Sequence, residues 1–104
     1  MSFDFRIVRD YEIKPACWQY WDNGRIVRTE PIEVLALYKI FLNNDVTRSY
    51  HFEIRKDDNE KGNLVFDHDD SLVEYLFQQK VGLKEVNELV QRIFNEMEKD
   101  YTGK

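Results

Sequence analysis

Two triplets in the chain have the residue types of half a metal-dependent nuclease site. Glu12–Lys14 and Glu53–Arg55 each place a carboxylate and a cation on one face of a strand. In such a site two carboxylates hold Mg²⁺ and the cation stabilises the developing charge. Asp45 is the candidate second carboxylate for the later triplet. One hypothesis is therefore a small metal-dependent nuclease or hydrolase that uses Asp45, Glu53 and Arg55, although charged strands commonly contain such triplets.

The other residue types that perform catalysis lack partners in the sequence. Nucleophilic catalysis needs a Ser, Cys or Thr beside a general base, and neither His51 nor His68 lies in a recognisable motif. We interpret both histidines as surface residues and Cys17 as a small buried apolar side chain. A single cysteine excludes an internal disulfide and a cysteine-cluster metal site. We expect no catalytic group, metal or cofactor, and a reducing, cytoplasmic compartment.

The most aromatic segment of the chain is a predicted β-hairpin. Asn23-Gly24 lies between two runs of aromatic and β-branched residues, Trp18–Trp21 and Arg25–Thr29. Asn-Gly is favoured in a type I′ turn because both central positions need a positive φ. The sequence therefore predicts a hairpin that carries both tryptophans and two arginines.

A two-residue turn determines which residues of this hairpin face each other. The predicted pairs are Trp21 with Ile26, Tyr20 with Val27, Gln19 with Arg28 and Trp18 with Thr29. Trp18, Tyr20 and Val27 then share a face that resembles core. The other face combines a large aromatic, an apolar neighbour and an arginine, as binding hot spots do. The candidate partner-binding residues are Gln19, Trp21, Ile26 and Arg28.

Three interpretations of this second face remain open. In the first, Trp21 is covered by the chain's own helices or by the stem of Arg28. In the second, the face binds a protein partner or a second copy, because Trp and Arg are enriched at interfaces. In the third, it stacks on single-stranded nucleic acid, an interpretation that the net charge of −5 disfavours because basic charge supplies most of that affinity.

Alternation of apolar and polar residues predicts strands through residues 3–66. The first strand has its apolar residues at odd positions from Phe3 to Ile13, with Arg9 as the exception, and Pro15 ends it. Val46–Arg55 shows the same alternation, and Leu64–Phe66 is predicted to be a short strand. The segment from Pro31 to Asn44 fits both a strand and a helix. We expect a strand buried on both faces, because a turn leads from it into the next strand.

The last third of the chain predicts two helices, at about residues 72–80 and 84–99. Ser71 and Glu74 form a capping box for the first, and Gly82 is placed to supply a positive φ after it. Apolar residues from Val86 to Met97 follow the helical i, i+3, i+4, i+7 template. Strands followed by helices predict an α+β domain over residues 1–104, with an antiparallel sheet of five to six strands and both helices on one face.

Charge is distributed unevenly along the chain. Residues 1–56 carry a net charge of +1 and residues 57–104 carry −6. Exposed helix faces are ordinarily acidic, but the same residues permit the hypothesis of a nucleic-acid mimic that inhibits a DNA-binding protein. No apolar run approaches the roughly 20 residues that cross a bilayer, so we expect no membrane partner. The leading hypothesis is a small non-catalytic binding or regulatory protein that acts through a protein partner or as a homodimer.

Overall fold

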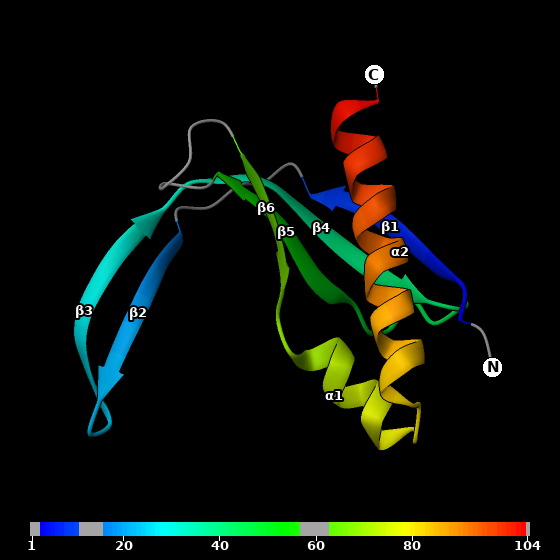
Figure 1. Ribbon diagram of the computed structural model, residues 1–104, viewed down its shortest axis with the longest axis horizontal. Coiled ribbons are helices and arrows are strands. Elements are labelled where there is room, and N and C mark those ends of the chain that lie inside the picture. Colours follow the sequence, from blue (N-terminus) through cyan, green and yellow to red (C-terminus); the bar gives the residue numbers. More distant parts are fainter. Residues whose placement is uncertain (1–2, 11–15, 57–62, 104) are drawn as a thin grey trace.

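The chain forms a four-stranded antiparallel sheet, a separate two-stranded hairpin and two C-terminal helices (Figure 1). The computed structural model describes residues 3–10, 16–56 and 63–103, with the backbone alone at 16, 18, 31 and 32. The elements are β1 (Phe5–Asp10), β2 (Ala16–Asp22), β3 (Arg25–Ile32), β4 (Val34–Leu42), β5 (Tyr50–Lys56), β6 (Leu64–His68), α1 (Ser71–Gln78) and α2 (Leu83–Thr102). The predicted α+β fold is confirmed, except that the strands form two sheets and not one.

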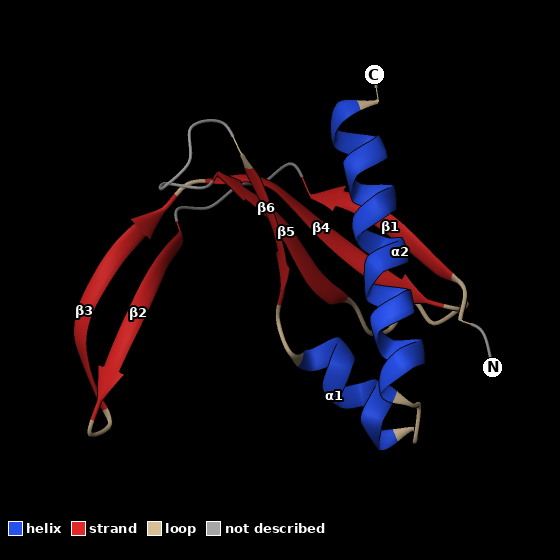
Figure 2. Ribbon diagram, viewed as in Figure 1, coloured by secondary structure: helices blue, strands red, loops and turns tan. Residues whose placement is uncertain are grey.

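The strand order in the large sheet is β1-β4-β5-β6, and all neighbours are antiparallel. Both helices lie on one side of this sheet (Figure 2). β4 is therefore a central strand with partners on both sides, which answers the question left open between strand and helix. The predicted residues 11–15, including the Pro15 turn and the Glu12–Lys14 triplet, lie outside the described residues.

The hydrophobic core lies between the large sheet and the two helices. Along β4, alternate residues from Ala36 to Leu42 are buried and face the helices, while Leu37 and Phe41 on the other face are half-buried. The prediction that this strand is buried on both faces is therefore wrong, because no described helix covers the second face. The core residues are Ala36, Tyr38, Ile40, Leu42, Tyr50, Phe52, Ile54, Leu72, Leu76, Val86, Leu89, Ile93 and Met97.

Over its described residues, Phe5–Asp10, the first strand follows its predicted alternation. Phe5 and Ile7 pack against the core from β1, and Arg9, the exception on that face, places its guanidinium 5.5 Å from the ring centre of Tyr101. The cation thus remains on the apolar face by stacking on an aromatic ring at the C-terminal end of α2. The apolar stems of such stacked arginines add to packing while their charge reaches solvent.

The helix ends differ from the predicted ones. No capping box forms at α1. The Ser71 amide and hydroxyl both donate to Asp69 Oδ1, and the Glu74 amide donates to the Asp70 carbonyl. The positive φ after α1 belongs to Lys80 at 62°, whereas Gly82 has φ −70° and precedes α2. The chain turns two residues earlier than the glycine indicates. No helix in the described part of the chain is long and apolar enough to span a membrane.

Candidate functional site

The candidate site is the β2–β3 hairpin, which we call the arm. Its turn is the predicted one, because Asn23 and Gly24 have φ values of 50° and 76° and both therefore lie in the left-handed region. The arm stands beyond β6, on the opposite side of the large sheet from β1 (Figure 1). The radius of gyration, 15.2 Å, exceeds the roughly 13 Å of a compact chain of this length. The arm accounts for this extended shape.

The register of the arm departs from the predicted one at a single residue. From the turn outward, the observed pairs are Asp22 with Arg25, Trp21 with Ile26, Tyr20 with Arg28, Gln19 with Thr29 and Trp18 with Glu30. Val27 is the extra residue of a β-bulge, which shifts every pair after the second. The predicted pairs of Tyr20 with Val27, Gln19 with Arg28 and Trp18 with Thr29 are therefore wrong, because they assumed a ladder without a bulge.

The bulge transfers Arg28 to the opposite face from Trp21. There its guanidinium lies 4.0 Å from the ring centre of Tyr20 and 3.2 Å from a carboxylate oxygen of Glu30. The Tyr20 hydroxyl also donates to Glu30 at 3.4 Å. This face, which we call the polar face, forms a closed network of a ring, a cation and a carboxylate. The interpretation that the Arg28 stem covers Trp21 is excluded by this placement.

The other face of the arm, which we call the Trp21 face, is apolar at the tip and uncovered. The side chain of Trp21 is 61% exposed and its cross-strand neighbour Ile26 is 45% exposed. Gln19 and Thr29 form the next pair on this face, and both are exposed. Three of the four candidate residues therefore share one face, as predicted, and Arg28 does not.

The arm contributes little to the core of the body. Val27 is 64% exposed and Tyr20 only half-buried, so the prediction of a core face is wrong; the Trp18 side chain lies outside the described residues. The predicted burial of Cys17 is also wrong, because this cysteine is exposed. The chain's own helices, which lie against the large sheet, leave Trp21 open to solvent. The arm is thus a two-stranded element with accessible side chains on both faces.

The alternative site is not assembled in this geometry. Asp45 lies in the turn after β4, where the hydroxyl and amide of Thr47 donate to its carboxylate and lower its pKa. Glu53 lies opposite Leu37, and β4 continues for five residues from Leu37 to Leu42 before the turn that holds Asp45. Leu37 and Leu42 are roughly 16 Å apart along the strand. The described residues contain no cluster of three His, Cys, Asp or Glu side chains able to hold a metal.

Glu53 and Arg55 instead belong to an ion-pair cluster on the sheet face away from the helices. The Arg55 guanidinium contacts Asp67 at 2.9 Å and Glu53 at 3.7 Å, and its side chain is only 18% exposed. Burial raises the pKa of the Glu53 carboxyl, and Arg55 partly opposes this effect. Arg55 therefore joins two carboxylates across the strands β5 and β6, a structural arrangement for a sheet face that no described helix covers.

The two histidines have different surroundings. His51 is exposed, as predicted, with its ring nitrogen 3.7 Å from Asp69. His68 is half-buried and stacks on Phe52 with 5.0 Å between ring centres, so its predicted surface position is wrong. His68 lies opposite Phe52 at the end of β6, on the face that the helices cover. This position makes it a packing residue.

Sequence reasoning placed Glu30 on the same face as Arg28 but missed their ion pair and the bulge at Val27. The Arg28–Glu30 ion pair had a readable signal, because residues two apart on a strand share a face. The bulge had none, because no glycine or proline marks Val27. Comparison with protein-family models, with curated proteins and with solved structures finds no match to this chain.

Proposed function

We propose that this protein is a non-catalytic binding protein that docks on a protein partner through the Trp21 face of the arm. The observation that carries the proposal is the adjacent exposure of Trp21 and Ile26 on an element that projects from the body. Tryptophan surrounded by small polar neighbours is typical of the centre of a protein interface. Gln19 and Thr29 supply the polar rim.

The bulge supports the same conclusion because it separates the two faces chemically. The polar face satisfies its charges internally through Tyr20, Arg28 and Glu30. The Trp21 face has apolar side chains that lose solvent contact only when another surface covers them. A two-stranded hairpin is marginally stable in water, and a third strand or a packed surface stabilises it. A docked partner supplies such a surface.

Photo-crosslinking tests this function directly. A photoreactive amino acid at Gln19 should give a discrete covalent adduct in cells, because Gln19 lies beside Trp21 on the same face. The same amino acid at Glu88, which is exposed on α2, is the matched control and should give no such adduct. A Gln19 adduct pattern indistinguishable from that of Glu88 would contradict the proposal.

The variant Trp21→Ala separates binding from folding. Because the Trp21 side chain is 61% exposed, its truncation should change the free energy of unfolding by no more than about 0.5 kcal/mol. The same variant should abolish the Gln19 adduct. Thermal unfolding and crosslinking are measured on one preparation, so a lost adduct in a folded protein identifies Trp21 as a binding residue. An adduct that survives the truncation contradicts that role.

A further inference from the structure

The strand β1 is an edge strand whose outer side is regular enough to accept another strand. It pairs with β4 over six consecutive residues without a register shift, and it is the first strand in the order of the large sheet. Natural edges are commonly blocked by a proline, a bulge or an inward-pointing charged side chain. Residues 5–10 contain no proline or bulge, and their one inward-pointing charge, Arg9, is held over the ring of Tyr101. This edge is therefore open to pairing.

The direction of the backbone groups shows which residues would pair. The Asp4 amide donates to Asn43 Oδ1 at 3.2 Å, and the Asp4 carbonyl accepts from the Asn43 amide at 2.7 Å. Asp4 thus directs both backbone groups toward the β4 side. Because this direction alternates along an antiparallel strand, Phe5, Ile7 and Arg9 direct theirs to the free edge.

We propose that β1 pairs antiparallel with β1 of a second copy of this chain, about a two-fold axis at Val8. This register places Arg6 opposite Asp10 of the second copy, and the symmetry repeats that ion pair on the other side of the axis. Val8, which is 37% exposed, meets Val8 of the second copy. Ile7 and Arg9 form the hydrogen-bonded pairs between them.

The charges of β1 select this register over its neighbours. Any alternative register must move the two-fold axis by a whole residue. Only then do residues that lie opposite each other have their side chains on the same face of the sheet. With the axis at Ile7, Asp4 lies opposite Asp10 of the second copy. With the axis at Arg9, two arginines face each other. Of these axes, and among residues 4–10, only the Val8 axis places no like charges opposite each other; it pairs Arg6 with Asp10, Ile7 with Arg9, and Val8 with Val8.

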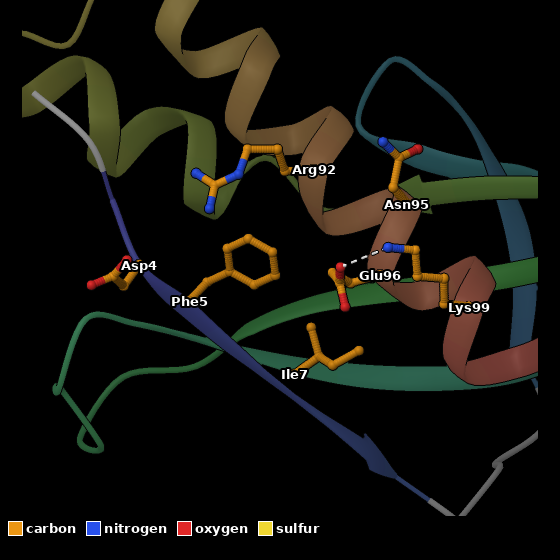
Figure 3. A pocket seen from close by; sticks show the side chains of 7 residues that line it. All are labelled: Asp4, Phe5, Ile7, Arg92, Asn95, Glu96 and Lys99. Carbon is orange, nitrogen blue, oxygen red and sulfur yellow. Dashed lines mark hydrogen bonds and ion pairs between the residues drawn. The ribbon is translucent and has the colours of Figure 1, made fainter. Parts of the chain in front are cut away.

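A groove along the same edge leaves room for the second strand. It has a volume of about 520 Å³ and lies between β1 and α2. Figure 3 shows Phe5 and Ile7 directed toward α2, with Arg92 and the Glu96–Lys99 ion pair on the opposite wall. The helix-side row of the added strand contains Ile7 and Arg9 of the second copy, and the wall that they meet carries one carboxylate, Glu96, and two cations, Arg92 and Lys99.

The pairing is compatible with the proposed function of the arm but does not depend on it. The arm stands on the far side of the large sheet from β1 (Figure 1). Dimerisation at β1 therefore leaves both Trp21 faces open, one at each end of a continuous eight-stranded sheet. Two arms on one particle raise the avidity for a partner with two sites.

Charge reversal tests the register by sedimentation equilibrium over a concentration series. The native chain should form dimers, and Arg6→Asp alone or Asp10→Arg alone should weaken association by about tenfold or more, because each variant brings like charges together twice. An equal mixture of the two variants should regain the native affinity as a heterodimer, because every pair is then opposite in charge. The control is Arg48→Asp, which reverses the charge of an arginine outside β1. Arg48 is exposed and lies over an aromatic ring, 5.2 Å from the centre of Tyr75.

The variant Ile7→Pro tests the edge independently of charge. It removes an amide that points to the free edge and leaves the β4 ladder bonds in place, so it should also prevent dimerisation while the chain remains folded by circular dichroism. A native chain that stays monomeric overturns the pairing, as does a mixture that fails to associate. A dimer that survives these changes but is lost in Trp21→Ala overturns it too, and places the contact on the arm.

Discussion

At the scale of single residues, the structure contains a carboxyl group whose charged form is disfavoured by burial. Glu53 is only 28% exposed, and burial raises the pKa of its carboxyl above the ordinary value of 4.5 even though Arg55 lies 3.7 Å away. The folded state therefore binds this proton more tightly than the unfolded chain does. The stability associated with Glu53 is fully present below pH 4.5 and is lost as the pH rises through the higher folded value.

The variant Glu53→Gln should show this effect as a difference between two pH profiles. The variant cannot ionise at this position, so its stability relative to the native chain should rise with pH from about pH 4.5 and then level off. Urea unfolding at a series of pH values measures this difference. A difference that stays constant with pH, or falls, would contradict the assignment of the raised pKa to Glu53.

The buried hydroxyl of Tyr38 joins the sheet to the end of α2. Tyr38 is 1% exposed, and its hydroxyl donates to Asp100 Oδ2 at 2.7 Å. Replacing it in Tyr38→Phe should cost about 1–2 kcal/mol, because the acceptor is a carboxylate. Equilibrium unfolding measures the loss. The matched control is Tyr20→Phe on the arm, whose bond to Glu30 is exposed and 3.4 Å long, and which should change stability less.

At the scale of elements, the sequence predicts periodicity better than it predicts ends. Alternation located β4 and β5, and the helical stripe from Val86 to Met97 located α2, because burial of one face controls both patterns. The position at which α1 ends was not predicted from the sequence. The Lys80 amide bonds to the Phe77 carbonyl and the Val81 amide to the Leu76 carbonyl, a Schellman motif without glycine. The hydrophobic position of Val81 against the core fixes the turn there.

The end of α1 predicts different effects of substitution at Lys80 and at Gly82. Lys80→Gly should stabilise the chain by about 0.5–1 kcal/mol, because Lys80 holds a φ of 62° that glycine adopts without a steric penalty. Gly82→Ala should leave stability unchanged or lower it slightly, since Gly82 has an ordinary φ with open space around it and is the N-cap of α2, where glycine is preferred over alanine. Thermal unfolding of both variants decides between the positions. The reverse order would place the strained residue at Gly82.

At the scale of the whole molecule, the arm explains why only part of the candidate site was predictable. The turn and the Trp21–Ile26 pair followed from local chemistry, namely Asn-Gly between β-forming runs. Whether the arm would pack on the body depends on contacts between distant segments, which no local pattern encodes. The bulge at Val27 then decided which side of the arm holds Arg28. Sequence thus located the binding candidates, and the three-dimensional structure divided them between two faces.

The separation of arm and body predicts two levels of stability in one chain. Residues of β4 and β5 lie in the core, whereas none of the described side chains of the arm belongs to it, so the arm should open without unfolding the large sheet. In hydrogen exchange followed by mass spectrometry, peptides from residues 16–32 should exchange faster than peptides from 34–42 and 50–56. Gly24→Ala should speed exchange in the arm alone, because the turn needs a φ of 76° at that position. Equal protection in the two regions, or loss of protection in both on this substitution, would show that the arm and body unfold as one unit.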